Sequence, residues 1–191
     1  MLYDDQDTED SVTKKCAECG SSSKVTMSPL EHKRHTLAHL LAKAILTDYP
    51  HAKPTIGPAV DTGFYYDIDF SAGAAPSDAD LKNIQTTMRK MLSNWTAFTH
   101  REVSASEARE VFAGNQFKIE LIDELAEKGE VITLYTVGSG KHEFTDLCRG
   151  GHAENPAEEI AADSFKLDKL AGAYWRGDEK NPMLTRIYGL A

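Results

Sequence analysis

Two pairs of reactive side chains, far apart in the sequence, constrain the fold of this chain more than any other feature. His35 and His39 are separated by three residues near the start, and Cys148 and His152 have the same spacing near the end. Imidazoles and thiols bind metals or transfer protons near neutral pH. If the two pairs serve one chemistry, the fold has to bring both ends of the chain to one pocket.

The first pair is expected on a helix over about residues 29–48. Ser28 suits the N-cap, Pro29 the first helical position, and Glu31 completes a capping box three residues after the cap. Pro50 is expected to end the helix, because a proline inside it would remove a backbone hydrogen bond.

Both histidines then lie on one face of this helix. His35 and His39 are one turn apart, and Ala42 and Leu46 continue the same face. Histidines that share a face with apolar residues suit the wall of a pocket better than a solvent-exposed surface.

The second pair follows an expected β-hairpin formed by residues 131–137 and 143–147. Cys148 lies near the end of the second strand, and His152 follows a double-glycine turn. Asp146 is two residues before Cys148, so both side chains face the same side of the strand. The glycines allow backbone N–H groups to approach a ligand closely.

Periodicity and capping signals predict the other elements. Period two predicts a strand over residues 63–70, with Tyr66 on its more apolar face. The rest of the expected elements are an amphipathic helix over 77–95, a short helix opened by a capping box at Ser104 and Glu107 and stopped at Gly114-Asn115, a helix near Lys118 that ends at Gly129, and a closing strand pair over 165–175 and 183–188. Helices interspersed with hairpins indicate an α+β fold with an antiparallel sheet and packed helices.

The composition indicates a globular, cytoplasmic protein. The chain is 41% hydrophobic and 27% charged, and its three cysteines argue against a disulfide framework. Residues 1–27 are acidic and poor in apolar residues, so we expect a disordered tail there. Within it, Cys16 and Cys19 form half of a zinc-ribbon pattern and are otherwise a pair of tail thiols.

The net charge of −9 argues mildly against a general nucleic-acid binder. Contact with a polyanion has to come from local clusters, such as Lys33-Arg34, Arg89-Lys90 or Lys166 with Lys169. Such clusters are more often simply solvated surface.

Four segments, in order, resemble one protein family. They are His35–Ile45, Ile56–Asp67, Asp146–His152 and Ala171–Asp178. Together they resemble the editing domain of bacterial-type threonyl-tRNA synthetase, which is related to that of alanyl-tRNA synthetase. The resemblance covers residue 29 to the end, so we expect an editing domain over residues 28–191.

The resemblance implies hydrolysis of the ester bond of mischarged seryl-tRNA(Thr), with the tRNA 3′ end as partner. Serine lacks only one methyl of threonine, which supplies roughly 1–3 kcal/mol of discrimination, too little for translation. A second site that admits serine and excludes threonine supplies the rest. The residues carried over to this site are His35, His39, Tyr66, Lys118, Asp146, Cys148 and His152.

The hypothesis for their roles has three parts. His35 with Asp146 orients or activates a water, Lys118 and Tyr66 hold a second water, the ribose hydroxyl or the carbonyl oxygen, and Cys148 with His152 shapes the seryl pocket. The threonyl branch implies no cofactor, whereas the alanyl branch implies zinc as a Lewis acid on His35, His39, Cys148 and His152. A covalent role for the cysteine is not required, since a ribose hydroxyl lies beside the ester.

Other interpretations remain open at this stage. In one, the two histidines are core residues whose hydrogen bonds are satisfied within the protein. In another, the chain is a zinc hydrolase of small molecules, although Thr36 and Leu37 follow His35 where such enzymes have the glutamate of their motif. A third is a non-catalytic tRNA-binding module. The family's ubiquitin-like, class II catalytic and anticodon-binding domains are not recognised here, so we expect no ligase activity and favour an excised part of a synthetase over a stand-alone trans-editing protein.

Overall fold

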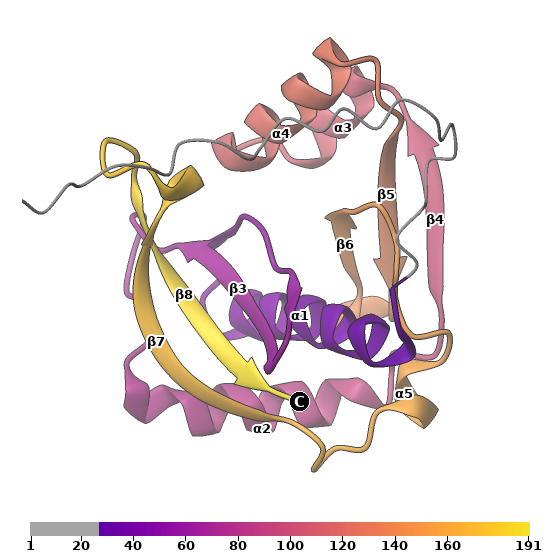
Figure 1. Ribbon diagram of the computed structural model, residues 1–191, viewed down its shortest axis with the longest axis vertical. Helices are drawn as coiled ribbons and strands as arrows, with labels where there is room; N and C mark the ends of the chain where they lie inside the picture. Colours follow the sequence, from indigo (N-terminus) through magenta and orange to yellow (C-terminus); the bar gives the residue numbers. More distant parts are fainter. Residues whose placement is uncertain (1–26) are drawn as a thin grey trace, which may run out of the picture.

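The computed structural model describes residues 27–191 and has the expected α+β fold (Figure 1). The predicted tail, with Cys16 and Cys19, falls almost entirely on residues 1–26 and so lies outside the described residues. Among the described residues, no helix combines the length and apolar character needed to cross a bilayer.

The chain alternates helices with short antiparallel strands. The helices are α1 (Pro29–Asp48), α2 (Leu81–Leu92), α3 (Ala105–Val111), α4 (Gln116–Glu127) and α5 (Pro156–Glu159). The strands are β1 (Lys53–Pro54), β2 (Ala59–Val60), β3 (Gly63–Asp69), β4 (Phe98–Val103), β5 (Ile132–Val137), β6 (Phe144–Leu147), β7 (Lys166–Tyr174) and β8 (Met183–Leu190). Short 3-10 turns lie at Asp78–Asp80, Gly140–His142 and Trp175–Gly177.

The strands form two antiparallel sheets rather than one. The larger sheet has the order β1-β3-β8-β7, with β2 also paired to β3, and the smaller has the order β4-β5-β6. Figure 1 shows α1 running through the middle of the molecule, with the larger sheet on one side and the smaller sheet on the other. This arrangement explains how residues near both ends of the chain meet.

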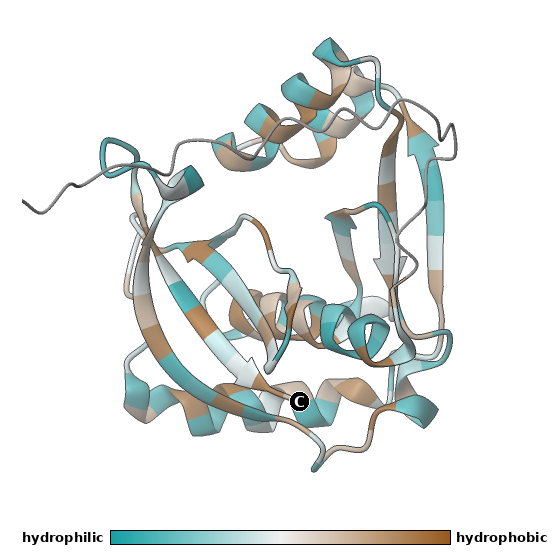
Figure 2. Cartoon of the chain, viewed as in Figure 1, coloured by the Kyte–Doolittle hydropathy of each residue, from teal (hydrophilic) through white to brown (hydrophobic). Residues whose placement is uncertain are grey.

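The start of α1 agrees with the sequence prediction. The Ser28 hydroxyl accepts the Glu31 backbone N–H at 3.3 Å, and the Ser28 N–H donates to Glu31 Oε2 at 2.6 Å. The helix is nevertheless buried on more than one face, because Leu37, Leu41 and Ala44 are as inaccessible as His39. Figure 2 shows the matching pattern: the N-terminal turns of α1 are hydrophilic and the rest is mainly hydrophobic.

Three details differ from the sequence prediction. The helix expected over 77–95 begins as a 3-10 turn and is α-helical only over Leu81–Leu92, although its apolar stripe is buried as expected. The Ser104 hydroxyl accepts the Glu107 N–H, but the Glu107 carboxylate pairs with Arg101 and leaves the capping box half-formed. Strand β4 was not predicted, because most of its side chains are exposed and show no alternation.

Candidate functional site

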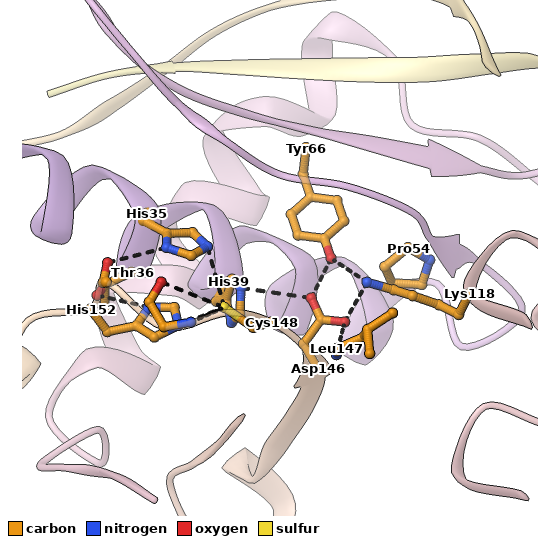
Figure 3. Close-up of polar contacts among 12 residues, drawn as sticks. His35, Thr36, His39, Pro54, Tyr66, Lys118, Asp146, Leu147, Cys148 and His152 are labelled. Carbon is orange, nitrogen blue, oxygen red and sulfur yellow. Dashed lines mark hydrogen bonds and ion pairs between the residues drawn. The ribbon is translucent and has the colours of Figure 1, made fainter. Parts of the chain in front are cut away.

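The site lies where α1, β3, α4 and the end of β6 converge around a cavity of about 420 Å³ (Figure 3). Six of the seven predicted site residues border this cavity: His35, His39, Tyr66, Lys118, Asp146 and Cys148. The other walls are mainly apolar and come from the β1–β2 loop, α4 and the residues after it. A mostly apolar cavity with a few convergent polar groups is the usual form of a small-molecule site.

One side of the site is a cluster of imidazoles and a thiol. The Cys148 Sγ lies 3.7 Å from His35 Nε2 and 3.3 Å from His152 Nε2. One ligand atom from each of His35, His39, Cys148 and His152 can be chosen so that all lie within 4.8 Å of one another. The two sequence pairs therefore do meet in one place.

The other side of the site is centred on the buried carboxylate of Asp146. The Tyr66 hydroxyl donates to Asp146 Oδ2 at 2.5 Å, and the Lys118 ammonium forms an ion pair with Oδ1. His39 Nε2 lies 3.7 Å from Oδ2. Lys118 and Asp146 are both about 3% exposed, so each charge needs the other to remain in this environment.

The histidine nearest to Asp146 is therefore His39, whereas the sequence hypothesis had paired His35 with this carboxylate. His35 instead contacts the Gly151 carbonyl oxygen through Nδ1 at 3.1 Å. The two imidazoles are edge-to-face with their centroids 4.9 Å apart. Within the described part of the chain, His39 Nδ1 is buried without a hydrogen-bond partner.

His152 is set behind the cavity rather than in its wall. Its ring stacks on Phe98 at 3.9 Å between centroids and on His35 at 4.3 Å. Sequence reasoning missed Phe98, because it begins the unpredicted strand β4. It also passed over Thr36, whose hydroxyl contacts His152 Nδ1 at 3.4 Å. The only signal for Thr36 was its place beside His35 on a buried helix.

Burial controls the protonation of the cluster. Desolvation is the main cause that lowers the pKa of His35, of His39 and of His152, and the Lys118 ammonium lowers the pKa of His39 further. Desolvation also raises the pKa of the Cys148 thiol to about 12. At neutral pH the imidazoles and the thiol are therefore uncharged.

Burial, followed by the nearby Asp146 carboxylate, raises the pKa of Tyr66 well above its usual value. This phenol therefore keeps its proton and remains a hydrogen-bond donor to Asp146.

The double-glycine turn directs a backbone N–H at the Cys148 thiol. Gly150 and Gly151 have φ angles of +90° and +83°, a region that favours glycine. A Cβ at Gly150 would lie 2.6 Å from the Tyr135 hydroxyl. The Gly150 N–H points at Cys148 Sγ at 3.3 Å, so this amide is engaged within the protein.

The donor set fits a zinc ion. Three imidazoles and one thiol match the ligands that zinc prefers. The Nδ1 atoms of His35 and His152 contact Gly151 O and Thr36 Oγ1, respectively. Zinc-bound histidines usually make such a contact through the ring nitrogen that does not bind the metal. The thiol, with its raised pKa, would have to lose its proton to bind the ion.

Known proteins similar to this chain are threonine–tRNA ligases. Residues 132–188 match the family described as the threonyl and alanyl tRNA synthetase second additional domain. The threonine–tRNA ligase of Dehalococcoides mccartyi is 46% identical over 86% of this chain, and that of Rubrobacter xylanophilus is 48% identical over 83%. The predicted resemblance to the editing domain of threonyl-tRNA synthetase is confirmed.

The likeness to threonine–tRNA ligases extends to other organisms. The enzyme of Thermotoga maritima is 44% identical over 84% of this chain. The chain spans about a quarter of the length of these ligases, 26% for Dehalococcoides mccartyi and 23% for Rubrobacter xylanophilus.

Proposed function

We propose that this chain hydrolyses the ester bond of seryl-tRNA(Thr), the editing reaction that removes misattached serine. The observation that carries this proposal is the convergence of a neutral imidazole, His35, and the buried Lys118–Asp146–Tyr66 group on one cavity. Ester hydrolysis needs a base for water and donors for the developing oxyanion, and these groups supply both. Residues 28–191 would form the hydrolytic domain, working in the cytoplasm.

His35 is the proposed base. Its Nδ1 must carry the proton, because its partner, the Gly151 carbonyl, only accepts. Nε2 is then unprotonated at the cavity side and can take a proton from water. The lowered pKa of His35 keeps this nitrogen free at neutral pH.

Lys118 is the proposed donor to the carbonyl oxygen. Its ammonium has three protons, one directed to Asp146 and one to the Tyr66 oxygen at 3.4 Å. The third is left for substrate. The single proton of the Tyr66 hydroxyl is committed to Asp146, so Tyr66 would accept a hydrogen bond from the ribose hydroxyl or a water.

Cys148 is the proposed contact for the seryl side chain. It borders the cavity and is 8% exposed, whereas His152 stands behind it. A neutral thiol packed between imidazoles leaves little freedom for the wall to move, which suits exclusion of the extra methyl of threonine. His152 would shape the pocket through Cys148.

The proposed partner is the charged 3′ end of tRNA(Thr). Lys128 and Arg149 border the cavity among apolar residues, and both side chains are exposed. Arg149 pairs with Glu130 at the surface, a weak interaction that a phosphate can replace. Such local cations are needed in a chain with a net charge of −9.

Deacylation assays with purified seryl-tRNA(Thr) and threonyl-tRNA(Thr) test the proposal. We expect release of serine without release of threonine, and loss of this release in His35→Ala with the fold retained. Hydrolysis of neither substrate, with tRNA still bound, would instead identify a non-catalytic tRNA-binding module.

The four-ligand cluster supports a second candidate, a zinc-dependent deacylase. His35, His39, Cys148 and His152 would hold the ion. Bound zinc would supply a Lewis acid and a more acidic water. Metal analysis of the purified chain, together with deacylation before and after chelation, separates the two candidates, since stoichiometric zinc with loss of activity on chelation favours this one.

A further inference from the structure

One arginine is held beside two carboxylates of helix α4. Arg176 lies in the 3-10 turn after β7, next to α4 (Figure 1). Its Nε lies 2.7 Å from Glu120 Oε1, and its Nη2 forms an ion pair with Glu124, one helical turn further on. The guanidinium also lies over the Trp175 ring, 5.2 Å from the centroid, and Trp175 Nε1 donates to Glu120 Oε2 at 2.9 Å. Three neighbouring side chains therefore fix the arginine.

The backbone at this position does not favour an arginine. Within residues 27–191, Arg176 is the one non-glycine residue with a positive φ angle, +57°. This region favours glycine, which has no Cβ. The side chains of Arg176 and its two acidic partners are all partly exposed, and exposed ion pairs contribute little to stability. The contacts of Arg176 therefore indicate a role besides stabilising the fold.

Glu124 lies where a negative charge would affect the proposed substrate. It borders the cavity, and among the described residues Asp146, which is buried, is the only other acidic residue that does so. The exposed cations at the same cavity are Lys128 and Arg149. A tRNA 3′ end that enters this cavity brings its phosphates to the opening, where a carboxylate repels them. An ion pair to Glu124 lowers this repulsion.

We infer that Arg176 is a positioning residue, which holds Glu120 and Glu124 in ion pairs beside the cavity and so lowers their repulsion of the tRNA phosphates. The two carboxylates are four residues apart on α4 and lie on one face, so one guanidinium reaches both. Without it, two like charges would stand one helical turn apart near the opening. The kinetic consequence rests on the proposed deacylase function, whereas the effect on RNA binding does not require hydrolysis.

Three variants separate the charge of Arg176 from its packing. Arg176→Met removes the charge and keeps an unbranched side chain over Trp175. Adding Glu124→Gln restores the original net charge and removes the carboxylate at the cavity, while the ion pair stays broken. Arg109→Met is the matched control, because Arg109 pairs with Asp123 of the same helix at 2.7 Å and neither residue borders the cavity.

The first measurement is the Kd of tRNA(Thr) without an amino acid, by fluorescence anisotropy. At about 50 mM salt, Arg176→Met should bind roughly 3–10-fold more weakly than the unsubstituted chain, and the difference should shrink at about 200 mM, because salt screens the carboxylates. The double variant should return to within about twofold of the unsubstituted chain, and Arg109→Met should stay within about twofold at both salt concentrations.

The second measurement is deacylation. With seryl-tRNA(Thr), Arg176→Met should raise KM by roughly 3–10-fold and change kcat by less than about twofold, because Arg176 touches no reacting group. The seryl ester of adenosine carries no phosphate, so Arg176→Met should hydrolyse it within about twofold of the unsubstituted chain. A displaced α4 would instead lower kcat with both substrates, since α4 carries Lys118.

Several results would overturn this inference. Equal losses of tRNA affinity in Arg176→Met and Arg109→Met would show an effect of net charge alone. A double variant that binds as weakly as Arg176→Met, or loss of adenosine-ester hydrolysis in Arg176→Met, would show that Arg176 acts by packing on α4. Absence of tRNA binding by the unsubstituted chain would also overturn it. If this chain binds tRNA but hydrolyses neither ester, the proposed function fails, and the affinities still decide the role of Arg176.

A single substitution covers failure of Arg176→Met to fold. Glu124→Gln in the otherwise unsubstituted chain removes the carboxylate at the cavity and leaves Arg176 in place. It should strengthen binding of tRNA(Thr) by roughly 2–5-fold at about 50 mM salt. Weaker or equal binding would contradict the inference, because Glu124 would then not repel the RNA.

Discussion

The Tyr66 hydroxyl donates to Asp146 Oδ2 at 2.5 Å across 80 residues of sequence. Tyr66 lies on β3 of the larger sheet and Asp146 on β6 of the smaller sheet, so this hydrogen bond links the two sheets beside α1. Lys118 on α4 completes the link by pairing with the same carboxylate. One polar group thus joins three parts of the fold and borders the cavity.

Tyr66→Phe should affect activity more than stability. The substitution keeps the aromatic ring and removes one hydrogen bond to a carboxylate that still has Lys118 and the Leu147 N–H as donors. We expect about 1–3 kcal/mol of lost stability in urea unfolding. Deacylation should fall at least about tenfold, if Tyr66 contacts the ribose hydroxyl or a water. Unchanged deacylation would remove Tyr66 from the proposed reaction.

The buried ion pair between Lys118 and Asp146 gives a prediction for stability. Lys118→Met leaves Asp146 as an unpaired buried carboxylate and should cost about 3–5 kcal/mol in urea unfolding. Adding Asp146→Asn should recover a large part of this loss, since no uncompensated charge then remains. Deacylation should stay low in both variants. Equal stability of the single and double variants would show that the unpaired Asp146 carboxylate is not the source of the loss.

Local signals predicted much of this architecture, whereas partners distant in the sequence were harder to assign. The capping box at Ser28 and the alternation over residues 63–70 depend on neighbours a few positions away, and both elements were found. The pairing of His39, rather than His35, with Asp146 depends on how β6 packs beside α1, which no local pattern encodes. Likewise Asp67 is buried because Arg186, on β8, binds it through two hydrogen bonds of 2.7 and 2.8 Å.

The histidine cluster predicts that the folded chain loses stability as the pH falls. Burial lowers the pKa of His35, of His39 and of His152 below the usual 6.5. Below that pH the unfolded chain binds protons that the folded chain does not, so the free energy of unfolding falls with decreasing pH. Each histidine contributes at most about 1.4 kcal/mol per pH unit, beginning near pH 6.5.

Urea unfolding of chelator-treated protein between about pH 7.5 and 5 measures this slope, above the range in which exposed carboxylates titrate. His152→Gln removes one titrating imidazole and should reduce the slope by up to about 1.4 kcal/mol per pH unit. A slope that is the same in this variant would mean that His152 binds its proton equally well in both states.

A side chain at Gly57 should disturb the packing of Tyr66 next to the proposed active site. A Cβ built at this position would lie 2.2 Å from Tyr66 Cδ2, and Gly57 itself borders the cavity. Gly57→Ala should therefore displace the Tyr66 ring, weaken its hydrogen bond to Asp146 and cost about 1–3 kcal/mol in urea unfolding. Gly172→Ala is a matched control, because the nearest atom there, at 3.1 Å, belongs to the flexible side chain of Met183.

A second variant tests whether the cost at Gly57 arises from the Tyr66 ring. In a Tyr66→Ala background the ring is absent, so Gly57→Ala should cost much less than it does in the unsubstituted chain, a coupling of about 1 kcal/mol or more. Deacylation should follow the same pattern, with no further loss from Gly57→Ala once the phenol is gone. Equal costs in the two backgrounds would show that Gly57 is required for its backbone rather than for the space it leaves to Tyr66.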